Sequence, residues 1–509
     1  MIIQVLITVP VSTLALYMAN FMTGPSFLAI DLGAESGRAI LGQIDERLTI
    51  EEVHRFSNGP VRVGSHIHWD VLRLWSEIQN SLRIASSTSW LAGIGLDTWG
   101  VDFGLLDSAD RLIGNPYHYR DARTNGMIEA ACQIVPREEI YNQTGIQLMQ
   151  LNTLIQLFAM RQENDPALQS ARTLLTMPDL FNFWLTGDKA SEFTISTTTQ
   201  CYNSREKRWA FELIAALDIP QSIFQHIVQP GIVLDRLHSS VAEEASCNCI
   251  PVIAVGCHDT ASAVAAVPAE GSDFIYISSG TWSLMGIESR EPIINEQSLK
   301  YDLTNEGGVC DTTLFLRNIM GMWLLHESRR QWMKAGADYS YDELINLAAD
   351  APALRSYIFV GDNRFLAHGD MVERIQEFCR ETSQPVPQTN GEVVRCILES
   401  LALEYRWGME KLRELSGRTL PVIHIIGGGS RNHLLNQFTA NATCCEVIAG
   451  PVEGTAIGNI LLQAIALGEL SSLQEGRALV RRSFDVVAYQ PNNRSTWDEA
   501  YSRYLALRK

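Results

Sequence analysis

The stretch FLAIDLGAESGR, residues 27–38, contains the pattern that decides the fold. Apolar residues lead into Asp31, a short run of small and polar residues follows, and an apolar segment resumes after Arg38. This order predicts a strand, a tight polar turn and a second strand. The related stretch YISSGTWS, residues 276–283, repeats the pattern in the other half of the chain.

Both turns are typical of loops that bind phosphate. Their glycines allow backbone N–H groups to approach phosphate oxygens closely, and Ser36, Ser279 and Thr281 add hydroxyl donors. A single fragment of this kind more often only turns the chain. One turn in each half predicts a cleft between two similar domains, each of which lends a loop to a polyphosphate.

A third segment, PVIAVGCHDTASA (residues 251–263), places a carboxylate just after a predicted strand. A strand that gives way to small residues puts such a side chain at a sheet edge, where clefts form. We interpret Asp259 as a candidate general base. The alternative is a structural aspartate that caps a helix beginning near Ala261.

In this order the segments resemble the carbohydrate kinases of the FGGY family, which share the actin-like ATPase fold. The resemblance runs from about residue 27 to about residue 491 and includes IGLDTWGVDF (94–103), YRDARTNG (119–126) and IIGGG (425–429). It implies an α/β protein with two actin-like, ribonuclease H-like ATPase domains flanking a central cleft. The implied parts are an N-terminal extension (1–26), two kinase domains (27–265 and 266–490) and a C-terminal helix (491–509).

The resemblance also implies how ATP and magnesium bind. Asp31 takes the place of an acid that holds Mg²⁺ through water, and a single carboxylate suffices because Mg²⁺ keeps several waters. Gly428 belongs to the adenosine motif, although the same glycines also suit a plain helix-entry turn. The implied cofactor-binding residues are Ala34, Glu35, Ser36, Gly37, Arg38, Thr281, His326 and Gly428.

Two of these positions depart from the family pattern. Glu35 replaces a small or hydroxyl residue, and we expect its charge to point to solvent, away from phosphate. His326 stands where Gln is more usual, and on a helix it suits a packing role as well as a nucleotide contact.

For the sugar, the resemblance implies contacts by Gly100, His258, Asp259, Thr260 and Asn318, with Asp259 as catalytic base. Trp99 supplies an apolar face or belongs to the core. The segments HDTASAV (258–264), SSGTWSLMG (278–286) and NIMG (318–321) are similar to the branch of the family that phosphorylates L-rhamnulose at O1. The alternatives are fuculose or xylulose as substrate, or a non-transferring actin-like ATPase or sugar sensor.

Length and charge limit the other possibilities. A chain of 509 residues fits two large domains, and a net charge of −18 argues against nucleic acid and anionic membranes as partners. We expect a cytoplasmic monomer or homodimer whose partners are a small-molecule sugar and ATP. The ten cysteines form no disulfide or zinc pattern, so we interpret them as mostly buried free thiols.

The first 26 residues carry no charged side chain and are mostly apolar. A signal peptide or membrane anchor is disfavoured, because no Lys or Arg precedes the run and Pro10 interrupts it. We expect translation to start at Met22 or Met18.

Helical periodicity predicts several helices, which span residues 70–85, 152–163, 178–185 and 392–415. Gly187 and Gly417 are the expected C-terminal caps of the last two, and Ser430 is the expected N-cap of a helix after the triple glycine. For Arg120 and Arg123 we expect a structural ion pair in at least one case.

Overall fold

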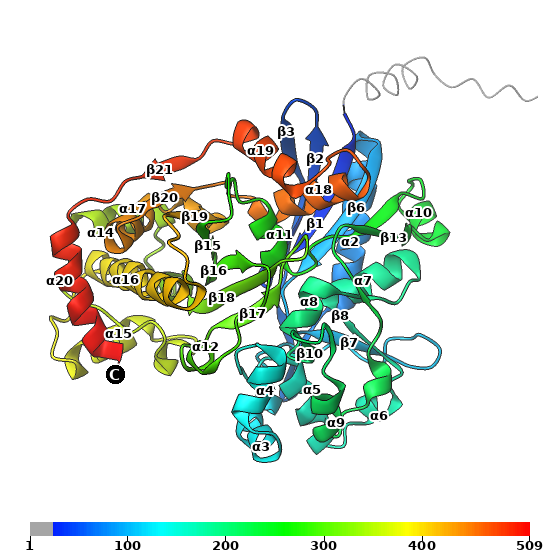
Figure 1. Ribbon diagram of the computed structural model, residues 1–509, viewed down its shortest axis with the longest axis horizontal. Helices are drawn as coiled ribbons and strands as arrows, with labels where there is room; N and C mark the ends of the chain where they lie inside the picture. Colours follow the sequence, from blue (N-terminus) through cyan, green and yellow to red (C-terminus); the bar gives the residue numbers. More distant parts are fainter. Residues whose placement is uncertain (1–23, 509) are drawn as a thin grey trace, which may run out of the picture.

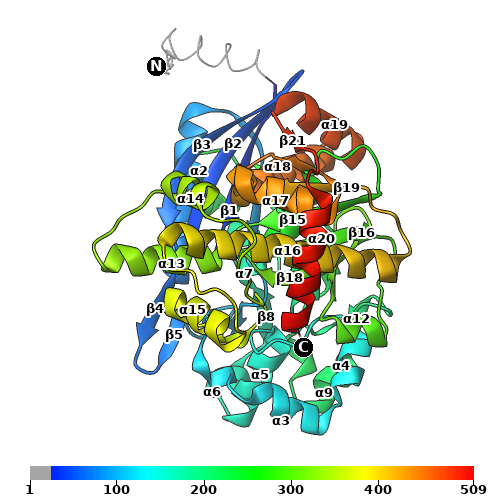
Figure 2. The same ribbon diagram turned by 90° about the vertical axis from the view of Figure 1, so that its left-hand side faces the viewer.

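The computed structural model describes residues 24–508 and contains two large mixed sheets with helices packed against them. Figure 1 shows the first sheet, coloured blue to green, beside the second, coloured green to red. The C-terminal helix α20 (Arg494–Leu505) lies against the second sheet's side of the molecule, where it contacts α16 (Asn390–Ser416) and α17 (His433–Thr443). Figure 2 shows the molecule from the side of α16 and α20.

The first sheet grows from the opening strand-turn-strand. β1 and β2 are antiparallel and align Asp31 with Arg38, whereas β1, β6 and β14 run parallel. The strand order is β13 (Ile232–Arg236), β14 (Pro251–Ala254), β6 (Leu91–Thr98), β1 (Ser26–Leu32), β2 (Ser36–Ile44) and β3 (Leu48–Ser57).

The second sheet repeats this arrangement. β15, β16 and β18 form an antiparallel meander, and β19 and β20 continue it in parallel from β15. The strand order is β17 (Thr304–Gly307), β18 (Thr313–Met320), β16 (Trp282–Ser289), β15 (Phe274–Ser279), β19 (Val422–Ile426), β20 (Glu446–Ala449) and β21 (Val487–Tyr489).

β1 is buried on both faces because a helix covers each side. Leu28 and Ile30 face the core cluster of α2 (Val71–Thr88), while Phe27 and Ala29 face that of α18 (Gly454–Ala466). Alternate side chains of a strand point to opposite faces, so a continuous apolar run is what a covered central strand requires.

The remaining helices surround these sheets and the loops that join them. Within residues 24–508 they are α3 (Met127–Ile134), α4 (Arg137–Thr144), α5 (Thr153–Gln162), α6 (Pro166–Ser170), α7 (Met177–Thr186), α8 (Phe193–Thr198), α9 (Phe211–Ala216), α10 (Ser239–Glu244), α11 (Asp259–Ala265), α12 (Glu296–Lys300), α13 (Trp323–Lys334), α14 (Tyr341–Asp350), α15 (Met371–Glu381) and α19 (Leu473–Ser483).

The helices expected from periodicity correspond to α2, α5, α7 and α16, and Gly187 and Gly417 cap the last two in the left-handed conformation. The expected cap at Ser430 is wrong. Asn432 is the N-cap of α17 and accepts a hydrogen bond from the Leu435 amide, whereas the Ser430 hydroxyl donates to the carbonyl of Gly427.

Several expectations concern residues or properties outside these elements. The expected start site and residues 1–23 of the expected N-terminal extension lie outside the described residues, whereas Ser26, assigned to that extension, already belongs to β1. The division into domains at residue 265 stays a prediction. All ten cysteines are free thiols, and five of them are buried.

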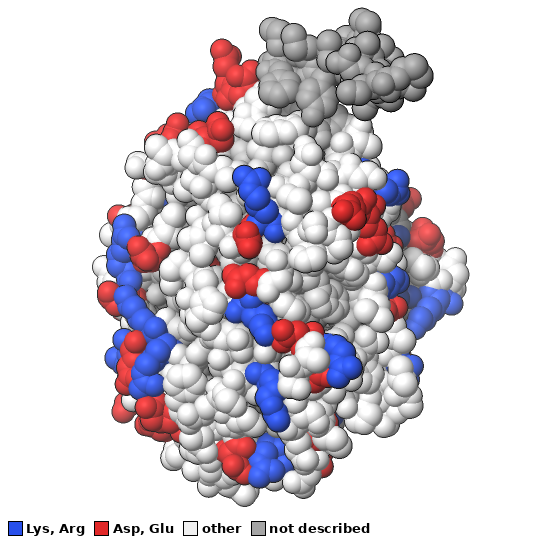
Figure 3. All heavy atoms as spheres, turned by 90° about the vertical axis from the view of Figure 1, so that its right-hand side faces the viewer, with Lys and Arg blue, Asp and Glu red and all other residues white. Residues whose placement is uncertain are grey.

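Surface charge is mixed on the face drawn in Figure 3, which is the right-hand side of Figure 1. Lys and Arg side chains alternate with Asp and Glu there, and the described part of this face carries no continuous basic patch. Within residues 24–508, every helix is too short or too polar to cross a bilayer.

Helices α11 and α18 touch at Gly458. A Cβ at this position would lie 1.7 Å from the backbone oxygen of Ser262, and neither helix backbone can move aside cheaply. We expect Gly458→Ala to lower the free energy of unfolding by about 1–3 kcal/mol through overpacking, as measured by denaturant titration.

Gly454→Ala is the matched control in the same helix, because its Cβ would meet nothing closer than 3.5 Å. Equal stability of the two variants would contradict the close approach of α11 and α18.

Candidate active site

Acidic side chains gather where parallel strands of the first sheet end. Asp31 pairs with Asp97 in the register of β1 and β6, and both are buried. Asp259 begins α11 a few residues beyond the end of β14. The carboxyl ends of parallel strands share one edge of a sheet, so the topology brings these carboxylates to the same place.

Burial and mutual repulsion shape the charge of this acidic edge. Desolvation, reinforced by the charge of Asp31, raises the pKa of Asp97 well above its usual range. The same two causes raise the pKa of Asp259 to about 7. The Asp259 side chain nevertheless keeps 33% of its surface exposed, so it remains reachable from a cavity.

Arg38 supplies positive charge beside these acids. Its guanidinium lies 2.7 Å from Asp31 and 2.5 Å from Glu453, the residue before α18. Burial by itself would lower the pKa of Arg38, but the attraction of the two carboxylates is stronger and the pKa is raised. Arg38 therefore joins the first half of the chain to the second.

A cavity of about 360 Å³ opens between the two sheets at this edge. It is lined from the first half by the turn after β1 and by the start of α11, and from the second half by the turns after β15 and β19. Nine of the expected site residues line it: Ala34, Arg38, Gly100, His258, Asp259, Thr260, Thr281, Asn318 and Gly428.

Asp31, Glu35, Ser36, Gly37 and His326 do not line this cavity. Asp31 lies behind Arg38, with which it pairs, and Ser36 and Gly37 belong to β2. A Cβ at Gly37 would lie 2.3 Å from the ring of Phe56, so the packing of this ring explains why the position is a glycine.

Glu35 is exposed, as expected, but it interacts electrostatically with the second half of the chain. Its charge acts on His326 at the start of α13. The ring of His326 packs edge-on against Tyr341, with 5.5 Å between the centroids. This arrangement agrees with the packing role, and the nucleotide role of His326 stays a prediction.

The two glycine turns of the second half lie against each other. A Cβ at Gly429 would lie 2.0 Å from the hydroxyl of Ser279, and Gly427 adopts φ +84 beside the carbonyl of the same serine. At Gly428, by contrast, a Cβ would meet no atom within 4 Å. Gly427 and Gly428 both line the cavity, and Gly428 is the one of the two whose missing side chain leaves open space.

Trp99 belongs to both the core and the cavity. It is buried, it lines the cavity, and its indole Nε1 donates to Asp102 at 3.0 Å. Asp102 also accepts hydrogen bonds from Trp69 and Gln156, although burial still raises its pKa to about 6.

Helix α8 holds several cavity segments through threonine hydroxyls, which the sequence analysis missed. Thr194 accepts from the amide of His258 at 3.1 Å, Thr197 from that of Gly307 at 2.7 Å and Thr198 from that of Val101 at 3.2 Å. The threonine-rich run at 194–199 was the available signal. Asp97 and Glu306, which also carry charge at the site, were missed as well.

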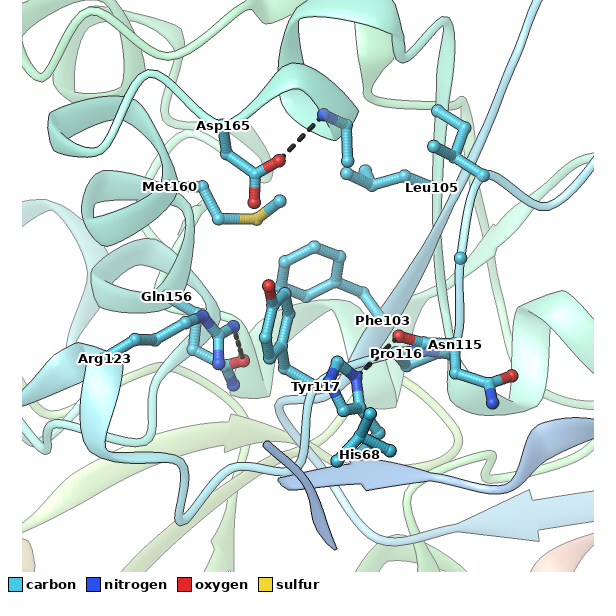
Figure 4. A pocket seen from close by; sticks show the side chains of 14 residues that line it. His68, Phe103, Leu105, Asn115, Pro116, Tyr117, Arg123, Gln156, Met160 and Asp165 are labelled. Carbon is cyan, nitrogen blue, oxygen red and sulfur yellow. Dashed lines mark hydrogen bonds between the residues drawn. The ribbon is translucent and has the colours of Figure 1, made fainter. Parts of the chain in front are cut away.

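A second cavity, of about 330 Å³, lies between the β4–β5 hairpin (Pro60–Val63 and His66–Trp69) and α5. Figure 4 shows Arg123 at its wall, hydrogen-bonded to Gln156 and beside the ring of Tyr117. None of the expected catalytic or binding residues lines it, and Arg123 is buried there between aromatic and amide groups.

The acidic edge fits a hard divalent cation. Asp97 Oδ2 accepts from Asn459, but the buried Oδ1 has no hydrogen-bond partner among the described residues. No three His, Cys, Asp or Glu side chains within residues 24–508 are placed to hold an ion together. One or two carboxylates completed by phosphate oxygens and water are the usual surroundings of Mg²⁺ with a nucleotide.

Family models match both halves of the chain. Residues 26–266 match the N-terminal domain of the FGGY family of carbohydrate kinases, and residues 275–467 match its C-terminal domain.

Curated relatives resemble the chain over nearly its whole length. A rhamnulokinase of Bacteroides thetaiotaomicron is 46% identical over 481 residues, which cover 94% of this chain and 98% of that one. A rhamnulokinase of Halalkalibacterium halodurans is 42% identical, covering 91% of this chain and 98% of that one.

Solved structures share the fold at low identity. A gluconate kinase of Lactobacillus acidophilus superposes with a TM-score of 0.79 at 17% identity, covering 95% of this chain and 97% of that one. A Plasmodium falciparum glycerol kinase with ADP superposes with a TM-score of 0.78 at 14% identity, covering 95% of this chain and 97% of that one. These matches confirm the expected two-domain kinase architecture.

Proposed function

The chain belongs to the FGGY family of carbohydrate kinases, and we propose that it transfers the γ-phosphoryl group of ATP to O1 of L-rhamnulose. Rhamnulokinase relatives at 39–46% identity, each covering at least 91% of this chain, support the sugar and the reaction. The observation that carries the chemistry is the position of Asp259 in a cavity lined by turns from both halves.

Asp259 is the proposed general base. A sugar hydroxyl is a poor nucleophile near neutral pH, so a carboxylate that accepts its proton lowers the barrier. A pKa raised to about 7 strengthens Asp259 as a base while leaving much of it ionised at neutral pH. Its exposed surface faces the cavity that Gly100, His258, Thr260 and Asn318 also line, and these are the proposed sugar contacts.

The phosphates are proposed to lie between Arg38 and Thr281, which line the same cavity from opposite sheets. Phosphoryl transfer needs alignment and charge neutralisation more than covalent help from the protein. Arg38 provides a fixed positive charge and the turn at Thr281 provides backbone and hydroxyl donors. Gly428 is proposed to let the nucleoside lie against backbone.

We propose Mg²⁺ as the divalent ion, held near Asp31 with Asp97 beside it. When bound, Mg²⁺ neutralises phosphate charge and orients the transferred group. Arg38 pairs with Asp31 and holds its carboxylate in place. Because the reaction consumes ATP, we propose a cytoplasmic location.

A panel of ketoses tests the proposed substrate. We expect L-rhamnulose to stimulate ADP release most strongly in a coupled assay, with L-fuculose and D-xylulose well behind. Faster turnover of another ketose would replace the substrate but keep the kinase. ADP release that no sugar stimulates would favour a non-transferring ATPase.

The acid limb of the pH profile tests Asp259. Because only its ionised form accepts a proton, kcat/KM for the ketose should fall as pH drops through about 7, with ATP and magnesium saturating. Asp259→Asn should reduce kcat by about 10²–10⁴-fold while calorimetry still detects ketose binding. Near-normal turnover of the variant would exclude Asp259 as the base, and an acid limb near pH 4 would contradict its raised pKa.

Gly428 offers a separate test of the nucleotide position. A methyl group at this position would contact no other atom of the protein and would project into open space, so Gly428→Ala should keep the melting temperature of the unmodified protein. The methyl group should obstruct the nucleoside and raise KM for ATP by about tenfold, which corresponds to a loss of about 1.4 kcal/mol. KM for the ketose should stay the same. Unchanged KM for ATP would place the nucleoside elsewhere.

A further inference from the structure

His258 and Glu306 face each other across the boundary between the two sheets. His258 Nδ1 lies 3.4 Å from Glu306 Oε2, and each side chain is only 8% exposed. Neither atom has a hydrogen-bond partner among the described residues. On its other side, His258 Nε2 lies 3.5 Å from Asp259 Oδ1. The imidazole therefore stands between the proposed base and a second carboxylate.

Helix α8 fixes this spacing from one side. The hydroxyl of Thr194 accepts from the amide of His258, and the hydroxyl of Thr197, one turn further on, accepts from the amide of Gly307, next to Glu306. Both residues are thus held by the same short helix, although they belong to different halves of the chain. The contact between them is part of the fold rather than a chance approach of two surface groups.

Burial disfavours charge on both His258 and Glu306. Burial lowers the pKa of His258, although the charge of Glu306 acts in the opposite direction. Burial also raises the pKa of Glu306. The other titratable groups that act on the row are Asp31 and Arg38, through Asp259, and Tyr276, whose own pKa Glu306 helps to raise. An imidazolium between two carboxylates would be stabilised by both, whereas a neutral imidazole donates to only one.

We propose that Glu306 is a positioning residue for the catalytic base. Its carboxyl group lies 3.4 Å from Nδ1 of His258 and so fixes the ring, whose Nε2 lies 3.5 Å from Asp259 Oδ1. This inference rests on the proposed function, because it assigns Asp259 the role of base. A buried carboxylate that lacks any cationic partner costs stability, and this role gives a reason for its presence.

The proton balance of the step is complete. The sugar O1 forms a bond to the γ-phosphorus as the bond from that phosphorus to the bridging oxygen of ADP breaks, and the O1 proton passes to Asp259. Asp259 holds the proton until the products depart. It then releases the proton to solvent, which restores its carboxylate.

Glu306→Gln tests the proposal with little change in shape. We expect kcat to fall by about 10–100-fold with KM for ATP nearly unchanged. The acid limb of kcat/KM should shift to lower pH, because one negative charge near Asp259 is removed. The melting temperature should stay the same or rise, since a buried carboxylate without a full partner is replaced by a neutral amide.

Glu399→Gln is the matched control, because Glu399 is equally buried but bonds to Arg395 and the Leu354 amide far from the cavity. It should lower the melting temperature without moving kcat or the acid limb. His258→Gln combined with Glu306→Gln should lose little more than either single variant, since both remove the same contact between residues 258 and 306.

Three outcomes would overturn the role of Glu306: an unchanged kcat and acid limb in Glu306→Gln, a loss of kcat that merely follows a loss of folded protein, or full additivity with His258→Gln. The comparison uses whichever ketose the unmodified protein turns over fastest. A different preferred ketose would thus change the proposed substrate and leave this test intact.

Discussion

The site depends on one electrostatic constraint, namely three carboxylates brought to one edge of the first sheet. Parallel pairing of β1 and β6 places Asp31 beside Asp97, and α11 begins with Asp259 at the same edge. Like charges in a poorly solvated place repel, and the raised pKa values of Asp97 and Asp259 express that repulsion. The fold tolerates them because Arg38 pairs with Asp31 and Asn459 bonds to Asp97.

The same constraint explains how an acidic protein can use a polyanionic substrate. Net charge is −18, so long-range attraction does not bring ATP to the cleft. Arg38 and the backbone turns act only at short range, and the proposed divalent cation would offset charge on the acidic edge and on the phosphates. Burial, reinforced by the charge of Asp31, makes Asp259 more basic, which is the property that proton acceptance from a sugar requires.

The sequence predicted the parts of this site that lie within single short segments. The two strand-turn-strand stretches, Asp259 and the glycine turn at residues 427–429 carry their own local signals and lie around one cavity. The missed groups act through contacts between distant residues, as Glu306 does on His258 and Asn459 on Asp97. The Ser430 cap failed for a local reason, since a 3₁₀ turn (Gly428–Arg431) separates the glycines from α17.

The contacts that complete the site also indicate how the two halves can move. Arg38 with Glu453, Asp97 with Asn459, and His258 with Glu306 each join one half of the chain to the other. The first two involve α18 or the residue before it, and α18 meets α11 without space at Gly458. Rotation about this tightly packed pair changes distances least near the pair and most at the far rim of the cleft. A rotation of the two halves about this pair would therefore move the rim of the cleft most and leave the acidic edge and its partners nearly unchanged.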